Sequence, residues 1–262
     1  MRLIAVKTRV VKIGDDLVEL ILGSLKAQGL QLEDNDVLAL TSKVVSYSEG
    51  RIVKLREVKP SEKAKRLAKK YSLKPEFAEL ILREGDRVYG GVERAVLTLK
   101  NGAMVANAGI DNKNAPSDNV VLWPKDPAAS AREVRDRIKR RTGKDVALMI
   151  IDSGLVPLRI GTTGFALAVA GFKPIRDIRG CKDLFGKPIM ITRQAVADDL
   201  ASAAHLLMGE ATEKTPAVLI KDAPLDFDDG VYASSSMMMP STECIFMKTL
   251  ETRSGAKRKA RA

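Results

Sequence analysis

Four acidic positions of this 262-residue chain lie at the ends of predicted elements rather than inside runs of charge. They are Asp111 in NAGID, Asp152 in IIDS, Asp198 or Asp199 in VADD, and Glu210 in LLMGE. Carboxylates in such places suit Mg²⁺ or Mn²⁺, since these ions keep several waters and take one or two carboxylates together with substrate phosphates. An isolated Asp at a strand end is also a common turn or cap residue. Spacing alone therefore leaves a metal site and a structural role both open.

A second set of polar residues suits phosphate. The apolar segment DVLALTSKVV predicts a buried strand over 36–45, and its C-terminal end carries Thr41, Ser42 and Lys43 before an exit loop over 46–50. Hydroxyls and an ammonium group can donate to phosphate oxygens. No G-x-x-x-x-G-K-[S/T] segment is present, and no G-x-G-x-x-G opens a helix after a strand. A bound nucleotide would need another scaffold.

Nucleophilic catalysis is not favoured. His205 is the only histidine, and no G-x-S-x-G segment accompanies it, so a Ser-His-Asp triad is not expected. We expect His205 to be an exposed or hydrogen-bonded structural residue. Cys181 lies in a basic, glycine-rich loop without a neighbouring histidine, and with Cys244 it completes the cysteine count. Two cysteines exclude a disulfide framework and a cysteine-rich zinc module.

Strands and helices that could position these residues alternate along the chain. Fully apolar segments predict buried strands, and apolar residues at helical spacing after capping residues predict helices. The predicted strands cover 1–13, 36–45, 145–151 and 215–221, with a strand pair over 88–105 around the Asn101-Gly102 turn. The predicted helices cover 17–25, 61–72, 75–84, 127–142 and 194–208, whereas 107–120 and 161–190 are predicted to be loops. The pattern indicates an α/β class.

Composition is that of an ordinary folded protein, with 45% hydrophobic and 29% charged residues. The N-terminus has no uninterrupted apolar segment of the signal-peptide kind, and no stretch approaches eighteen apolar residues without a charge. We therefore expect a cytoplasmic protein that has no membrane segment.

The net charge of +11 favours anionic partners, but its distribution matters more than its size. Residues 51–74 carry ten Lys or Arg against two acids, residues 132–144 carry seven against two, and four more lie in the tail over 257–261. Aromatic residues make up only 4% and are not interleaved with these runs, as a base-stacking surface would require. Solvated helix faces and a disordered tail are favoured over an RNA surface or a site for a phosphorylated substrate.

Read in order, several segments together resemble one enzyme family. They are GDDL (14–17), SKVVS (42–46), EGRI (49–52), NAGID with Asn114, the strand ending at Asp152, RxG and GFA (159–166), KDLFG (182–186), VADDLASAAHLLMGE (196–210) and TPAVLI (215–220). The set is similar to the coenzyme F-420-0:gamma-glutamyl ligases, over about residues 9 to 222. No single segment is decisive, but the ordered set is specific.

The resemblance implies a mixed α/β fold with mixed sheets, flanking helices and two lobes, assembled as a homodimer. It implies an N-terminal lobe over 1–88 with nucleotide-binding segments, a second lobe over 89–224 with the metal-binding acids, and a C-terminal extension over 225–262 with the basic tail. The implied activity is that of a GTP-dependent ligase. It would join L-glutamate to a carboxylate of the deazaflavin coenzyme precursor through an acyl phosphate, with Mg²⁺ or Mn²⁺ and with K⁺ as a further ion.

The resemblance also carries roles onto matching positions of this sequence. The implied metal ligands are Asp111, Asp152, Ser153 and Glu210, and the implied catalytic residue is Arg159. The implied nucleotide-binding residues are Val10, Val11, Lys12, Ser42, Lys43, Asn114, Met208 and Gly209.

Two departures from the family pattern bear on specificity. Tyr47 replaces a lysine, and Leu155-Val156 replaces a Gly-Arg pair after Asp152. Both changes remove positive charge, so we expect weak or absent activity on the F-420 precursor unless Arg159 compensates. A paralogous ligase for a different carboxylate and a non-catalytic nucleotide- or RNA-binding relative stay open as alternatives.

Overall fold

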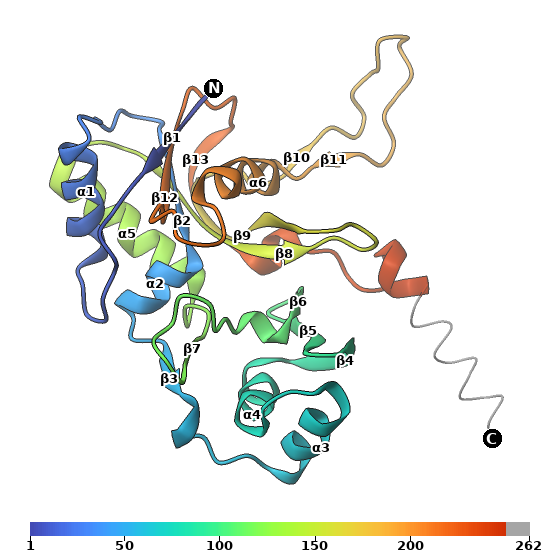
Figure 1. The fold of residues 1–262 in the computed structure, drawn as a ribbon. Helices are drawn as coiled ribbons and strands as arrows, with labels where there is room; N and C mark the ends of the chain where they lie inside the picture. Colours follow the sequence, from blue (N-terminus) through green and yellow to red (C-terminus); the bar gives the residue numbers. More distant parts are fainter. Residues whose placement is uncertain (250–262) are drawn as a thin grey trace.

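The computed structural model describes residues 1–249, and a six-stranded mixed sheet lies at its centre (Figure 1). The strand order is β1-β12-β2-β8-β9-β13; β2 and β8 are parallel, and all other neighbours are antiparallel. The strands are β1 (Arg2–Val6), β2 (Val37–Thr41), β8 (Ala147–Leu155), β9 (Thr162–Phe172), β12 (Ala217–Lys221) and β13 (Phe227–Ala233).

Helices cover both faces of this sheet. Leu38 and Leu40 of β2 belong to the core cluster formed with α1 (Leu17–Ala27) and α5 (Pro127–Thr142). Val37 and Ala39 of the same strand pack in the cluster formed with α6 (Val196–Met208). A strand stretch buried on both faces needs apolar side chains at every position, which is why residues 37–40 of β2, 147–151 of β8 and 217–220 of β12 are continuous hydrophobic segments. The expected mixed α/β fold is confirmed.

A smaller body follows β2 along the chain and occupies the lower part of Figure 1. Its core packs helix residues such as Tyr71 and Ile81 against strand residues such as Val96 and Val120. The strands form a β3-β7 pair and a β4-β5-β6 sheet. The elements are β3 (Ile52–Lys54), η1 (Leu55–Glu57), α3 (Glu62–Tyr71), α4 (Pro75–Glu84), β4 (Arg87–Val92), β5 (Ala95–Lys100), β6 (Ala103–Ala106), η2 (Asn107–Gly109) and β7 (Asn119–Val121).

Helix boundaries follow the capping residues of the sequence. Asp126 accepts hydrogen bonds from the backbone N–H groups of Ala128 and Ala129 at the start of α5, and Gly143 ends that helix at φ 70°. Asp16 caps α1, and Ser61 caps α3. The predicted helices in these places are confirmed because the caps are local in sequence.

The predicted strand over 36–45 with an exit loop over 46–50 is wrong in its second half. The strand ends at Thr41, and α2 (Ser42–Ser48) begins directly after it. Val44, Val45 and Tyr47 are buried on this helix, so the apolar run continues although the backbone changes from extended to helical. β-branched residues at that point hid the change.

The predicted irregular loop over 161–190 is also wrong, because its first third is the long strand β9. The glycines in this segment led to the prediction of a loop. Two of them, Gly164 and Gly171, instead let neighbouring backbone approach the strand closely. A Cβ on Gly164 would lie 2.3 Å from the Ala201 oxygen of α6, and one on Gly171 would lie 3.0 Å from Ala147.

Three smaller boundaries differ from prediction. β8 runs through Asp152 to Leu155 because β9 pairs with it over that length. β1 ends at Val6, so residues 7–13 leave the sheet. The segment 88–105 falls within three strands, β4 to β6, rather than two, although Asn101-Gly102 does lie at the predicted turn, between β5 and β6.

Two projections leave the body (Figure 1). One is the turn over 156–161 between β8 and β9, and the other is an arm over 176–194 that starts and ends in the short pair β10 (Arg176–Asp177) and β11 (Arg193–Gln194). η3 (Ser234–Met237) follows β13, and residues 245–249 are helical. The basic tail over 257–261 lies outside the described residues. The boundaries predicted after residues 88 and 224 stay predictions. Among residues 1–249, no helix combines the length and apolar character needed to span a membrane.

Candidate active site

Four segments of the chain meet at one edge of the central sheet. Thr41 at the end of β2 lies opposite Ile151 of the parallel strand β8. Ala217 at the start of β12 lies opposite Leu40 on one side and Val6, the last residue of β1, on the other. The segments that follow β1 and β2, the outer part of β8 and the loop before β12 therefore gather at this edge, where open α/β sheets bind their ligands.

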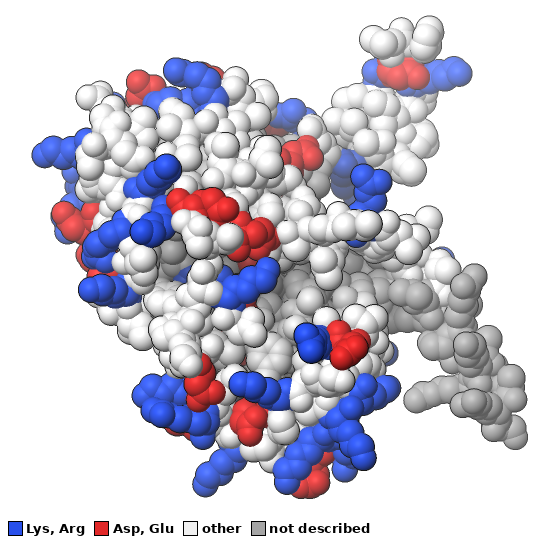
Figure 2. Space-filling view, in the orientation of Figure 1, with Lys and Arg blue, Asp and Glu red and all other residues white. Residues whose placement is uncertain are grey.

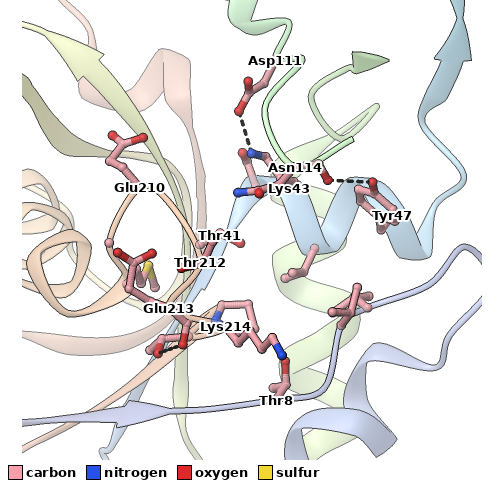
Figure 3. A pocket seen from close by; sticks show the side chains of 18 of the residues that line it. Thr8, Thr41, Lys43, Tyr47, Asp111, Asn114, Glu210, Thr212, Glu213 and Lys214 are labelled. Carbon is pink, nitrogen blue, oxygen red and sulfur yellow. Dashed lines mark hydrogen bonds and ion pairs between the residues drawn. The ribbon is translucent and has the colours of Figure 1, made fainter. Parts of the chain in front are cut away.

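A cavity of about 710 Å³ opens at this edge, and Figure 3 shows side chains that line it. Its wall comes from residues 8–13, 41–47, 111–116, 151–153 and 205–216. The structure brings together twelve predicted site residues there, namely Val10, Val11, Lys12, Ser42, Lys43, Asp111, Asn114, Asp152, Ser153, Met208, Gly209 and Glu210. Their roles as ligands stay predictions.

Lys43 and two aspartates form the charged centre of this wall. Lys43 Nζ lies 2.6 Å from Asp111 Oδ2 and donates to the Lys113 carbonyl oxygen at 3.0 Å. The pKa of Asp152 is raised to about 6. Burial is the largest cause and the charge of Asp111 adds to it, whereas the Ser153 N–H, Trp123 and Lys43 act against the rise. Asp111 and Asp152 are thus close enough for one carboxylate to disfavour ionisation of the other.

Glu210 lies on the opposite wall and is held by three groups. Its Oε1 accepts hydrogen bonds from Thr162 Oγ1 at 2.7 Å and pairs with His205 Nε2 at 2.9 Å, and its Oε2 lies 3.6 Å from Lys113 Nζ. Burial opposes ionisation of Glu210, but these hydrogen bonds and the charge of Lys113 outweigh it and hold its pKa below the usual value. His205 is therefore a hydrogen-bonded residue beside the cavity.

The loop that carries Asp111 and Asn114 is tied down from two sides (Figure 3). Tyr47 Oη of α2 donates to the Asn114 carbonyl oxygen at 3.2 Å, and Asn114 Nδ2 donates to the Ala211 carbonyl oxygen at 2.8 Å. Asn114 adopts a left-handed backbone, φ 54°, which asparagine tolerates better than most residues. Tyr47 thus supports the loop that lines the cavity.

The departures in sequence and the candidate Arg159 lie in different places. Tyr47 lines the cavity, whereas Leu155 and Val156 are exposed in the projecting turn of β8 and β9 and do not line it. Arg159 lies in the same exposed turn, outside the cavity, and its catalytic part stays a prediction. Of the changes, only Tyr47 alters the charge of this cavity.

The donors around the cavity fit a divalent ion that is completed by phosphate. Within residues 1–249, no three His, Cys, Asp or Glu side chains lie close enough to form a metal cage by themselves. Asp111 and Asp152 instead place two like charges near each other, which a cation would relieve. Mg²⁺ takes one or two carboxylates, waters and substrate phosphates, so two acids beside a nucleotide-sized cavity suffice.

Some residues of the site were missed by sequence reasoning. Trp123, the single tryptophan, donates from its indole N–H to Asp152 Oδ2. Lys113 faces Glu210, and residues 212–214 complete the wall between α6 and β12. The one signal in the sequence was that Trp123 is the single tryptophan and precedes Pro124. The neighbouring residues do not indicate which side chain it contacts.

Comparison with known proteins gives a consistent result. A family model described as F420-0:Gamma-glutamyl ligase matches residues 5–222. A protein of Methanopyrus kandleri named Coenzyme F420:L-glutamate ligase is 42% identical over 214 residues, covering 81% of this chain and 83% of the relative. Proteins with the same name from Methanothermobacter thermautotrophicus and Archaeoglobus fulgidus are each 39% identical, covering 83% and 80% of this chain and 88% and 83% of their own lengths.

Proposed function

Because this chain belongs to the F420-0:Gamma-glutamyl ligase family, we propose that it is a GTP-dependent ligase that joins L-glutamate to a carboxylate of the coenzyme F-420 precursor. One observation carries the proposal. Twelve residues that the family pattern connects with nucleotide or metal come from five separate segments and line one cavity of about 710 Å³. A volume of this size suits a nucleotide-like ligand.

In this proposal the basic residues of the cavity bind phosphate and the acidic residues bind metal. Lys12 and Lys43 border the cavity and would face the phosphates of GTP. Asp111 and Asp152 would hold Mg²⁺ or Mn²⁺ together with phosphate oxygens, with Ser153 beside them, and the metal-ligand role of Glu210 stays a prediction. A bound divalent ion would neutralise charge on the transferring phosphoryl group, and positioning with charge neutralisation supplies most of the rate in such transfers.

The proposed chemistry has two steps. A carboxylate oxygen of the precursor attacks the γ-phosphorus of GTP, so that an acyl phosphate forms and GDP leaves. The amino group of L-glutamate then attacks the acyl carbon and loses a proton, and inorganic phosphate leaves as the amide bond forms. Asn114 and the loop over 209–214 would keep the nucleotide in place while both steps occur.

We propose a homodimer built through the two projections. Large apolar side chains on them are almost fully exposed, including Leu158 at 105%, Ile160 at 107%, Leu184 at 99% and Phe185 at 87%. In Figure 2 both projections show large white areas, which charged side chains interrupt on the arm. Large apolar side chains exposed to this extent favour contact with another protein surface, and a second copy offers the same side chains.

The test is an assay with GTP, Mg²⁺ or Mn²⁺, L-glutamate and the F-420 precursor. We expect a product heavier by one glutamyl unit, one phosphate released for each bond, and loss of turnover in Asp152→Asn. Asp222→Asn is the matched control, because Asp222 is an exposed acid paired with Arg2 at the far edge of the sheet. Absence of any GTP-dependent glutamyl product would overturn the proposal and favour a ligase for another carboxylate or a binding protein.

A further inference from the structure

We infer that Trp123 is a positioning residue that holds the Asp152 carboxylate in the orientation needed by a divalent ion; this rests on the proposed function of the cavity. Trp123 lies at the end of the smaller body, just after β7, whereas Asp152 belongs to β8 of the central sheet. The side chain therefore connects the two bodies at the acid that lines the cavity.

Both oxygens of Asp152 are held by different donors. The Trp123 indole N–H donates to Oδ2, and the backbone N–H of Ser153 donates to Oδ1 at 2.8 Å. Two donors fix the rotation of the carboxylate about its last bond, and the remaining lone pairs of both oxygens stay free for another ligand. Hydrogen bonds of this kind orient metal ligands and strengthen their binding.

The indole ring is itself held firmly. Trp123 is 3% exposed, and its ring centroid lies 6.1 Å from that of Phe165 in a tilted arrangement. Lys100 Nζ lies 5.2 Å from the ring centroid on the ring face, and Arg51 Nε donates to the Trp123 carbonyl oxygen at 3.0 Å. Glu84 of α4 then pairs with both Lys100 and Arg51, at 2.8 and 3.0 Å. The tryptophan thus has a fixed side chain and a fixed backbone.

Gly109 in the NAGID segment leaves the space that the Trp123 ring occupies. Its φ of +68° and its lack of a side chain let the indole lie directly against the backbone. A Cβ added there would lie 2.2 Å from Trp123 Cε2. Alanine at position 109 would therefore displace the ring and its N–H from Asp152.

The experiment compares Mn²⁺ binding by four variants of the full chain, with GDP present and free Mn²⁺ counted by electron paramagnetic resonance. Trp123→Phe removes the N–H and keeps an aromatic ring, and Gly109→Ala keeps the N–H but displaces it. Phe165→Leu is the packing control, because it removes the aromatic neighbour of the indole ring and leaves the indole N–H in place. Asp152→Asn reports on the metal site itself.

We expect Trp123→Phe and Gly109→Ala to raise the Kd for Mn²⁺ about tenfold to a hundredfold. Phe165→Leu should leave that Kd unchanged even where it lowers the melting temperature. Excess Mn²⁺ should restore the turnover of Trp123→Phe, which a general loss of packing would not allow. Wild-type Mn²⁺ affinity in Trp123→Phe, together with lost affinity in Asp152→Asn, would overturn the positioning role and leave the proposed function standing.

A measurement on the unaltered protein keeps the inference testable if a variant does not fold. Because Trp123 is the only tryptophan, an amide spectrum contains a single indole N–H resonance. We expect the chemical shift of this proton to lie downfield of that of a solvent-exposed indole N–H and to change when Mg²⁺ and GDP are added. An indole resonance at the exposed position, unmoved by Mg²⁺ and GDP, would count against the hydrogen bond. Unchanged Mn²⁺ binding in Asp152→Asn would remove both the metal site and this inference.

Discussion

Asp111 and Asp152 show how single residues prepare the cavity for a cation. They come from distant parts of the chain, yet the charge of one disfavours ionisation of the other, and Lys43 is paired at 2.6 Å with Asp111. Carboxylates held together at a cost to stability are typical of functional sites. The first two predictions address this cost and the ion that would relieve it.

The first prediction uses Trp123 as a reporter of metal binding. Because its indole contacts Asp152, paramagnetic Mn²⁺ bound at the acids should quench its fluorescence saturably in the presence of GDP, and Mg²⁺ should reverse the quenching by competition. Asp152→Asn should weaken the quenching about tenfold or more, since a charged ligand is lost. Asp222→Asn serves as control. Quenching that rises linearly with Mn²⁺, without saturation, would show collision rather than a site.

The second prediction concerns the acid dependence of stability. The pKa of Asp152 is raised from 3.8 to about 6 by burial, so between these values the folded state keeps a proton that the unfolded state releases. Acidification from pH 7.5 to 4.5 should therefore stabilise the metal-free wild type relative to Asp152→Asn by about 2 kcal/mol. This stabilisation is complete below pH 3.8, the pKa of Asp152 in the unfolded chain, and is lost as the pH rises through about 6, its pKa in the folded protein. Urea denaturation in EDTA measures both chains, and parallel pH profiles would contradict the assignment.

At the scale of elements, α6 is positioned by its tight contact with β9. The Asp198 carboxylate accepts from the Ala166 N–H at 2.9 Å, and Ser202 Oγ donates to the Gly164 carbonyl oxygen at 3.0 Å. The helix ends at Met208 and passes directly into the cavity wall. The distance of α6 from β9 therefore sets where that wall lies.

The third prediction tests this contact with a pair of glycine substitutions. Gly164→Ala should destabilise the protein by about 1–3 kcal/mol, because its Cβ would lie 2.3 Å from the Ala201 oxygen and α6 would have to move. Gly23→Ala should instead stabilise by about 0.5–1 kcal/mol, because this exposed position of α1 has nothing within 4 Å of an added Cβ. Thermal denaturation of both variants measures the difference. A neutral Gly164→Ala would show that the helix adjusts freely.

At the scale of the whole molecule, the exposed apolar side chains of the projections and the charged surface of the lower lobe differ in what can satisfy them. Cations gather over the lower lobe in Figure 2, where α3 carries Lys63, Arg66 and Lys69 on its solvent side. The projections carry Phe185 and Ile191 at 87% and 86% exposure. Solvation can satisfy the charged surface, whereas the apolar one gains by being covered.

The fourth prediction is the mass in solution. Light scattering at micromolar concentration should give twice the chain mass of 28.5 kDa, and Phe185→Asp combined with Ile191→Asp should give one chain mass while thermal unfolding stays cooperative. Val92→Asp is the control, since Val92 is equally apolar and 70% exposed in the β4-β5 hairpin of the other lobe. A wild-type monomer would contradict the homodimer.

The sequence alone determined the features that depend on near neighbours. Asp126 with Pro127 located α5, Asp16 located α1, and continuous apolar segments located β2, β8 and β12. Caps and burial periodicity act within a few residues, so their patterns can be read without knowing the partner. The ordered motifs also indicated the family to which the chain belongs.

Only the tertiary structure decided how these elements combine. The glycines that hid β9 make sense once α6 lies against Gly164, and the start of α2 at Ser42 depends on burial of Val44 and Tyr47 in the core. Asp152 meets Trp123 across 29 positions of sequence because two bodies join there. Such contacts are non-local: their free energy depends on which distant surfaces meet, and no pattern along the chain records that meeting.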